Sequence, residues 1–325
     1  MTHNIESQPQ VKPQPKVTSP SNLPQAPAGA IEHKPRIWQR LSFRSALHAI
    51  VIYSLIIGIG TVILMPLSWM ITASLRGEGE VVFTIPVAWI PTESFHFENF
   101  WYVLNYPSYP LWRPTLNSIH LVALNIIGVV ISNTMVGYTF ARLRFPGRDL
   151  LFKLVILTML LPGIVLMIPS FLLFNTIGWY GTYLPLWVPS FFGSAFFIFI
   201  TRQYMRSFPR ELDDASRIDG CGFFGTYWRI ILPLSKPVLV VMAIFTFVDV
   251  WNDFQGPLIY LNDADKFTLA IALDYFRRST FSTATTNTVN YVMAASLMSI
   301  VPLLALYFAA QKQLIGGIAS VGLKG

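Results

Sequence analysis

The chain has 325 residues, of which 53% are hydrophobic and only 12% are charged, and its formal net charge is +7. Soluble domains carry roughly 25% charged residues, so this composition, with a mean hydropathy of +0.52, excludes an ordinary soluble protein and indicates an integral membrane protein. The single cysteine, Cys221, excludes a disulfide framework and a cysteine-based metal site.

Residues 1–40 form the first predicted segment, a Pro- and Gln-rich cytoplasmic tail. Residues 1–35 contain seven prolines, four glutamines and no aromatic residue. Such a composition cannot bury enough apolar surface to fold, so we expect disorder. The segment is not a cleavable signal either, because the first apolar run begins too late and is too long.

Six membrane-spanning helices are predicted from the stretches that lack charged residues. Three stretches each fit one helix, at about 46–72, 115–140 and 291–311. The longest stretch contains a turn at 175–181 and therefore predicts two helices, about 152–174 and 183–203. A sixth apolar run covers 237–261. The outer segment 73–113, rich in Pro, Trp and Phe, is expected to pack on the outer membrane face.

The distribution of basic residues predicts the orientation of these helices. With the N-terminus inside, the cytoplasmic segments from residue 34 onward hold 16 Lys and Arg residues, whereas the outer segments hold five, against seven acidic residues. Basic residues concentrate on the cytoplasmic side of membrane proteins. Both termini are therefore predicted to be cytoplasmic.

The loop 205–235, between the fourth and fifth helices, is the most informative segment. Acidic residues in a first turn and a three-residue apolar repeat of Leu212, Ala215 and Ile218 predict a short amphipathic helix, ended by Gly220 in the left-handed conformation. A second amphipathic stretch should follow, with its apolar residues on one face and Pro233 as its stop; these residues are Phe223, Phe224, Tyr227, Trp228 and Ile231. This arrangement suits docking into a partner's groove, and a loop lying flat on lipid headgroups is the alternative.

The spacing within this loop resembles the EAA signature of ATP-binding-cassette (ABC) importer permeases. Asp214-Ala215-Ser216 is followed by Gly220 and, after nine intervening residues, by Ile230, Leu232 and Pro233. Asp214 replaces the signature Glu and Ser216 its second Ala. Residues outside the loop extend the resemblance, namely Asn117-Ser118, Tyr138 to Arg142, and Trp251 to Phe254. With them, the chain is similar to the maltose-type carbohydrate branch of the family, and within it to the smaller of the two permease subunits.

The resemblance implies an all-α integral membrane protein with six transmembrane helices and the type I ABC importer permease fold. It divides the chain into the tail 1–40, a first helix with outer segment 41–113, a permease core 114–312 and a cytoplasmic C-terminal tail 313–325. The implied partners are a second permease subunit, an ATPase dimer, an extracellular solute-binding protein and the lipid bilayer, with no nucleic acid. The implied location is the cytoplasmic (inner) membrane of a prokaryote, and the implied solute is a carbohydrate, namely a sugar, an oligosaccharide or a related solute.

In this family the EAA loop forms a coupling helix in a cleft of the ATPase. The implied ATPase-coupling residues are Glu211, Asp214, Ala215, Ser216, Arg217, Asp219, Gly220, Ile230, Leu232 and Pro233. The C-terminal stretch is implied to reach the ATPase interface, and the alternative is a frayed tail; the residues concerned are Gln311, Lys312, Gly317 and Lys324. No Gly-Lys dipeptide occurs, so no Walker A loop exists and the ATPase must be another chain.

Three polar residues of the fifth helix, Asp249, Asn252 and Asp253, lie deep in the predicted membrane. Counted from Lys236, Asp249 is about 20 Å and Asp253 about 25 Å along the helix. A structural role is favoured for Asn252 and Asp253. For Asp249, a structural role and a place on the solute pathway are equally compatible with the sequence.

The sequence contains no catalytic or metal-binding constellation, and no cofactor is expected. A stand-alone secondary transporter or channel is the main alternative function. It would need coupling-ion sites and usually internal repeats, and neither is visible in the sequence.

Overall fold

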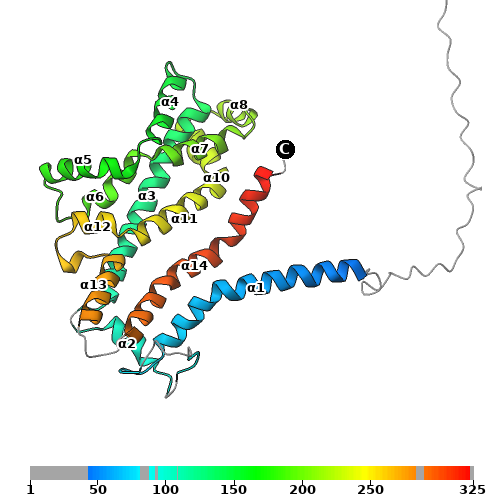
Figure 1. Ribbon diagram of the computed structural model, residues 1–325. Helices are drawn as coiled ribbons and strands as arrows, with labels where there is room; N and C mark the ends of the chain where they lie inside the picture. Colours follow the sequence, from blue (N-terminus) through cyan, green and yellow to red (C-terminus); the bar gives the residue numbers. More distant parts are fainter. Residues whose placement is uncertain (1–42, 81–87, 92–93, 108, 283–288, 323–325) are drawn as a thin grey trace, which may run out of the picture. The chain divides into compact units, whose positions relative to one another are not determined.

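The computed structural model describes residues 43–80, 88–91, 94–107, 109–282 and 289–322, and within these ranges it contains helices and no strand (Figure 1). The chain divides into two compact units, Met1–Gly60 and Thr61–Gly325. The first helix, α1 (Phe43–Ser74), crosses that boundary. Within the described ranges, four helices are long and apolar enough to span a membrane, and the number rises to six if each of two bent helix pairs counts as one span.

Three of the predicted spans are confirmed as single helices. They are α1, α3 (Trp112–Arg142) and α14 (Val289–Gly322). The predicted span 291–311 agrees with the part of α14 that is apolar enough to cross a membrane, Val289–Gln311, and the helix itself continues through Lys312 and Gly317 to Gly322. Lys324 and the predicted tail 1–40 lie outside the described residues.

Two other predicted spans are broken, and the prediction of one continuous helix in each was wrong. The stretch 152–174 consists of α4 (Arg148–Thr158) and α5 (Gly163–Thr176), which are bent by 96°. Pro162 has an extended conformation at the break, because it has no N–H to continue the helix. The stretch 237–261 consists of α11 (Lys236–Asn252) and α12 (Gln255–Tyr260).

The span 183–203 is also interrupted near its middle. It comprises α6 (Leu184–Trp187), the 3₁₀ helix η3 (Val188–Phe192) and α7 (Ala195–Arg206), with Gly193 at φ 88° between the last two. Backbone groups freed at such a break need partners, because lipid supplies none. The side chains of α3 supply them.

Polar side chains of α3 bond directly to this interruption. Asn125 Nδ2 donates to Leu186 O at 3.0 Å, and Ser132 Oγ donates to Ser190 O at 3.0 Å. Asn133 Oδ1 accepts from the backbone N–H of Ser194 at 2.7 Å. Besides η3, α3 packs against α7 and α11, so it is central to the packing of the second unit (Figure 1).

Two glycines of α3 let the neighbouring elements approach closely. A Cβ at Gly128 would lie 2.6 Å from the ring of Phe191 in η3, and a Cβ at Gly137 would lie 2.7 Å from Thr201 in α7. Small residues at helix contacts are a feature of membrane bundles, in which packing and hydrogen bonds replace the hydrophobic effect.

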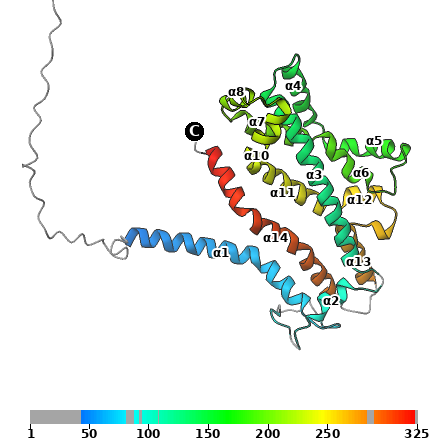
Figure 2. The same cartoon turned by 180° about the vertical axis from the view of Figure 1, so that it is seen from behind.

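The two ends of α3 carry different structures (Figure 2). At its N-terminal end lie α2 (Glu98–Leu104) and α13 (Leu269–Ser282), which share one apolar core with α11 and α14. Within the described part of the segment 73–113, Asn99 is buried and donates to Ser74 O and Arg76 O, so α2 packs on the end of α1 and the turn after it. At the C-terminal end lie α4, α7 and the loop 205–235.

Candidate functional site

The loop 205–235 begins with a short helix, α8 (Glu211–Ile218), which carries three acidic residues in its first turn. Gly220 follows at φ 76° and ends it, as predicted. Gly220 N–H donates to Arg217 O at 3.0 Å, and Cys221 N–H donates to Ser216 O at 2.8 Å. This pair of bonds forms a Schellman motif, which requires the left-handed residue that glycine supplies at least cost.

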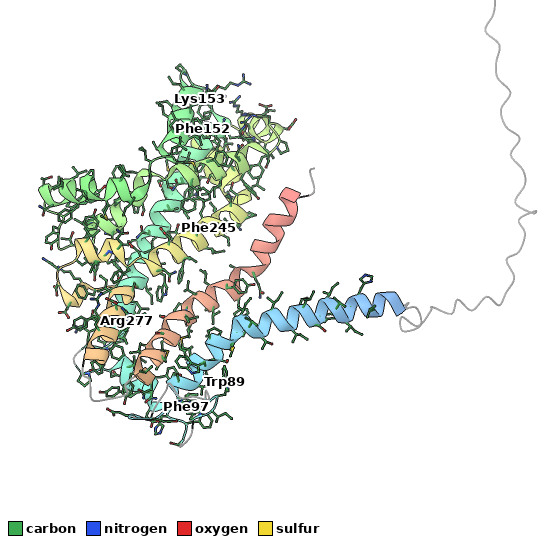
Figure 3. The ribbon with its side chains drawn as sticks, in the orientation of Figure 1. Trp89, Phe97, Phe152, Lys153, Phe245 and Arg277 are labelled. Atoms are coloured by element: carbon green, nitrogen blue, oxygen red, sulfur yellow. The ribbon has the colours of Figure 1, made fainter. Side chains whose placement is uncertain are left out.

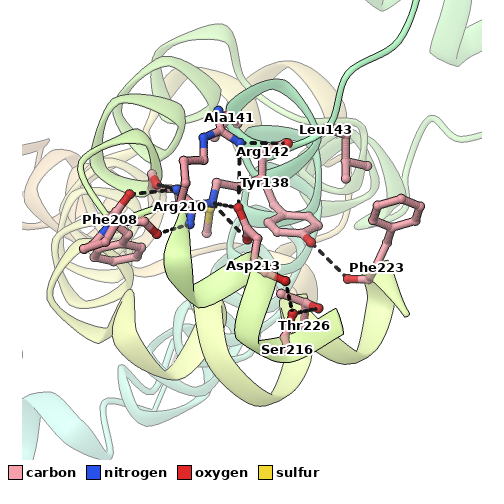
Figure 4. A network of polar contacts seen from close by, with 12 residues as sticks. Tyr138, Ala141, Arg142, Leu143, Phe208, Arg210, Asp213, Ser216, Phe223 and Thr226 are labelled. Carbon is pink, nitrogen blue, oxygen red and sulfur yellow. Dashed lines mark hydrogen bonds and ion pairs between the residues drawn. The ribbon is translucent and has the colours of Figure 1, made fainter. Parts of the chain in front are cut away.

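The buried side of α8 is polar and is held by Arg142, the last residue of α3 (Figure 4). Arg142 Nε lies 3.1 Å from a carboxylate oxygen of Asp213, and the side chains of the two residues are 1% and 14% exposed. The Arg142 guanidinium also donates to Phe208 O and to Pro209 O, both at 2.8 Å. One buried cation therefore fixes both the start of α8 and the turn before it.

Further polar contacts complete the attachment, which we call the Arg142 latch. Arg210 donates to the carbonyl oxygens of Arg142 and Ala141, at 3.1 and 3.2 Å. Ser216 donates to Asp213 O, and its hydroxyl lies 2.8 Å from that of Thr226. The Arg142 latch thus joins α3, α8 and the helix that follows.

That second helix is built from α9 (Phe223–Thr226), the π-helix η4 (Tyr227–Ile231) and α10 (Leu232–Leu234). It runs through Pro233, so the prediction that Pro233 stops it was wrong. It ends at Ser235, where α11 departs at 75°. The wider π turn directly precedes the proline, whose ring would crowd the carbonyl four residues earlier in a regular α-helix.

The predicted single apolar face of the second helix is divided between two environments. Tyr227 and Ile231 are buried against Tyr138 of α3, whereas Phe223, Phe224 and Trp228 are 58–66% exposed. Tyr227 adds a hydroxyl contact of 2.8 Å with Thr134. Tertiary packing on α3 uses one side of the helix and leaves the three aromatic rings outside.

The predicted apolar residues of α8 lie mainly outward, since Ala215 is exposed and Ile218 is 87% exposed, whereas Leu212 is half-buried. Ser216, by contrast, is buried. The bound side of α8 is therefore its polar side. We call Ile218, Phe223, Phe224 and Trp228 the exposed apolar residues of the loop.

The structure places the other predicted coupling residues around this surface. Those with exposed side chains are Glu211, Asp214, Arg217, Asp219 and Pro233. Ile230 and Leu232 are half-buried beside the Tyr138 cluster. Arg217 lies 5.8 Å from the centroid of the Phe223 ring.

Arg142, Arg210, Asp213 and Thr226 were missed as functional residues by the sequence analysis. Arg142 was noted as the end of a span, but nothing in the sequence connected it with Asp213, 71 residues further along the chain. One usable signal was present: Arg142 stands at the end of a predicted span, on the same side of the membrane as the loop 205–235. An arginine in that position can form an ion pair with an acidic residue of the loop.

The three polar residues of α11 have different environments. Asn252 donates to Val248 O within its own helix, and Asp253 Oδ1 accepts from Gly256 N–H at 3.0 Å at the start of α12. Asp249 is exposed and lines a cavity with residues of α3, η3 and α7. At the other predicted contact region, Gln311 is half-buried and donates to Phe308 O in α14.

Comparisons with known proteins agree with these features. The family model described as the binding-protein-dependent transport system inner membrane component matches residues 133–318. The arabinooligosaccharides transport system permease protein AraQ of Halalkalibacterium halodurans is 32% identical, over 82% of this chain and 93% of that protein. The melibiose/raffinose/stachyose import permease protein MelC of Bacillus subtilis is 27% identical, over 80% of this chain and 91% of that protein.

The fold is also similar to a solved structure. A chain of a bacterial ABC transporter that imports the acidic polysaccharide alginate superposes with a TM-score of 0.72 at 21% sequence identity. The match covers 84% of the present chain and 98% of that chain.

Proposed function

Because the chain belongs to the family of binding-protein-dependent transport system inner membrane components, it is a permease subunit of an ABC importer, and we propose that its solute is a carbohydrate. The resemblance to importer permeases is thereby confirmed, and the multi-pass membrane location follows from the family and the apolar helices. ATP hydrolysis belongs to a separate chain. The names of the relatives support a sugar or oligosaccharide as solute.

The loop 205–235 is, in this proposal, the site at which the ATPase subunit docks. The observation that supports it is the arrangement of the loop, in which the polar side of α8 is bound to α3 through the Arg142 latch while the exposed apolar residues of the loop face outward. Exposed clustered aromatic and aliphatic side chains are typical of partner surfaces. A rigid attachment to α3 would transmit the movement of a docked partner to the centre of the bundle.

The remaining partners follow from the same family. A second, homologous permease subunit completes the transmembrane pathway, and an extracellular binding protein delivers the solute. Both termini are proposed to be cytoplasmic, in the inner membrane of a prokaryote, because the basic residues gather at the ends that this orientation places inside. The end of α14 with Gln311, Lys312 and Gly317, followed by Lys324, is proposed as a second ATPase contact.

The division into a tail 1–40, a first helix with outer segment 41–113, a permease core 114–312 and a tail 313–325 is retained as a proposal. The core contains α3, around which the broken spans pack, and it includes most of the residues that the family model matches.

Co-purification of the tagged chain with its genomic neighbours in mild detergent tests the docking proposal. The wild-type chain should bring down a second permease and two ATPase copies. Ile218→Asp should keep the second permease and lose the ATPase, because it places a charge in the exposed apolar residues of the loop. Ile90→Asp is the matched control, since Ile90 is 67% exposed outside this loop and its substitution should retain both partners.

Retention of the ATPase by Ile218→Asp would refute this docking surface. Recovery of the chain alone, folded and active in uptake, would instead support a stand-alone transporter.

A further inference from the structure

Five basic side chains gather where α3 and α7 end and α4 begins. We call them the basic patch: Arg144, Arg148, Lys153, Arg202 and Arg206. Figure 3 shows Phe152 and Lys153 of α4 in this region. Arg144 and Arg148 line a cavity of about 340 Å³, and the other residues that line it are Phe145, Gly147, Asp149 and Leu150.

Electrostatic interactions connect the members of the basic patch across α4 and α7. The charges of Arg148 and Arg206 act on the guanidinium of Arg202. The charges of Lys153 and Arg202 act in turn on the carboxylate of Asp149. Arg206 follows Arg202 by four residues, a spacing that places both on one side of α7. The five side chains therefore form one positively charged region.

The carboxylate within this region does not balance its charge. Asp149 is the one acidic residue in the lining of the cavity, and Arg148 Nε already donates to it at 3.0 Å. Arg144, Lys153 and Arg206 are exposed, and they have neither a hydrogen bond nor an ion pair with the described residues. An anion from outside the described chain would therefore reduce the repulsion among these cations.

Arg202 is held in place by aromatic side chains. It is 8% exposed, its Cζ lies 3.8 Å from the centroid of the Phe152 ring, and its Nε donates to Phe140 O at 3.4 Å. The Phe152 ring also packs against the rings of Phe140 and Phe199, at 5.5 and 6.5 Å between centroids. Arg202 thus joins α7 to α4 and gives the basic patch a fixed positive charge, while the exposed members offer surface for contact.

The start of α4 adds hydrogen-bond donors to the same cavity. Gly147, at φ 79°, precedes the helix, and no side chain caps it. The first N–H groups of a helix have no partner within the helix, and the positive end of its dipole attracts anions. Asp149 and Leu150 stand in this first turn and line the cavity. Together with Arg144 and Arg148, this turn suits the oxygens of a phosphate group.

Exposed leucines of α4 indicate the source of such a phosphate group. The four leucines that follow the basic start of α4 are 47–64% exposed; they are Leu150, Leu151, Leu154 and Leu157. With α5, α4 forms one of the two bent helix pairs that are apolar enough to span a membrane. A surface that is basic at its start and apolar along its length fits a phospholipid, with the headgroup at the basic end and the acyl chains beside the leucines. A free phosphate ion would use only the basic end.

We propose that the basic patch binds the headgroup of an anionic phospholipid, whose acyl chains lie along the exposed leucines of α4. Arg144, Lys153 and Arg206 contact the headgroup, and Arg148 and Arg202 add positive charge behind them. In the orientation proposed above, this lipid belongs to the cytoplasmic leaflet. Because α7 leads directly into the loop 205–235, the bound lipid would stabilise the base of that loop.

The test uses the complete importer, with its second permease and ATPase, in nanodiscs of phosphatidylcholine and phosphatidylglycerol. The native cysteines are replaced, Cys221 by serine, and a fluorophore on Leu154→Cys reports the neighbouring lipid through quenching by brominated acyl chains. Brominated phosphatidylglycerol should quench at lower mole fractions than brominated phosphatidylcholine. Arg144→Gln combined with Arg206→Gln should reduce this preference about fivefold or more, because each basic side chain near a membrane surface favours anionic lipid by about that factor.

Arg229→Gln combined with Lys236→Gln is the matched control. Both residues are exposed and lie outside the basic patch, so the same loss of charge there should leave the preference unchanged. An excess of inorganic phosphate at matched ionic strength should not change it either. The variant that lacks Arg144 and Arg206 should still co-purify with the second permease and the ATPase, which would exclude a general loss of the fold.

Equal quenching by the two brominated lipids, or an equal loss of preference in both double variants, would overturn the proposal. Displacement of phosphatidylglycerol by inorganic phosphate would assign the basic patch to a free anion and would also overturn it. Loss of the ATPase from the Arg144 and Arg206 variant, with unchanged lipid preference, would assign the basic patch to a protein partner instead. The lipid measurement needs neither a solute nor a particular orientation, so each of these results leaves the function proposed above intact.

Discussion

Replacement of Arg142 by methionine tests the role of the Arg142 latch. The substitution keeps an apolar stem and removes a guanidinium that is 1% exposed, lies 3.1 Å from Asp213 and donates to two carbonyl oxygens at 2.8 Å. Removal of one member of a buried ion pair costs about 3–5 kcal/mol. Arg210 remains 3.7 Å from Asp213, so we expect the lower end, about 3 kcal/mol.

The loss should be local, because the apolar helices do not depend on the Arg142 latch. Hydrogen exchange of the α8 amides should therefore accelerate about a hundredfold, since each 1.4 kcal/mol corresponds to a factor of ten. Exchange in α3 should remain slow, and solute uptake by the assembled importer should fall sharply.

Arg148→Met is the matched control for this measurement. Arg148 pairs with Asp149 at 3.0 Å, but the two side chains are 28% and 72% exposed, and such pairs contribute about 0–1 kcal/mol. Unchanged α8 exchange in Arg142→Met, or equal acceleration in Arg148→Met, would refute the reasoning.

Three further predictions concern two glycines and the ion pairs of Asp274 in α13. Gly220→Ala should destabilise the end of α8 by about 1–2 kcal/mol, because φ of Gly220 is 76°, although no atom lies within 4 Å of the added Cβ. Gly222→Ala should have little effect, because φ of Gly222 is −74°. Equal hydrogen-exchange rates of the α8 amides in the two variants would contradict this prediction. Gly128→Ala should lower the thermal stability of the detergent-solubilised protein, since its Cβ would lie 2.6 Å from Phe191; an unchanged melting temperature would count against close packing of α3 on η3. Hydrogen bonds from Arg277 and Arg278 lower the pKa of Asp274 in α13, so its stabilisation is present above the ordinary Asp value of about 4 and is lost as the pH falls through the lowered pKa. The difference in melting temperature between the wild type and Asp274→Asn should therefore narrow under acidic conditions, and a difference that widened there would contradict the assignment.

Several features were determined by the sequence alone because their causes are local. Runs of apolar residues long enough to cross a bilayer predicted α1, α3 and α14. The left-handed Gly220 at the end of α8 was predicted for the same kind of reason, since only the residues beside it decide where that helix stops. The family resemblance also rested on a short motif with fixed spacing.

Only the tertiary structure decided which sides of these helices are used. A three-residue repeat predicted one apolar face for α8 but said nothing of how the helix is attached within the chain. The structure attaches it through Asp213 and Ser216, because Arg142 and Thr226 offer polar partners at that place. The break at η3 has local signals in Pro189 and Gly193, but its hydrogen-bond partners could not be predicted from that segment, since they are Asn125, Ser132 and Asn133, some 60 residues earlier. Hydropathy measures the cost of placing a segment in lipid, whereas these choices depend on the polar partners that other segments bring within about 3 Å.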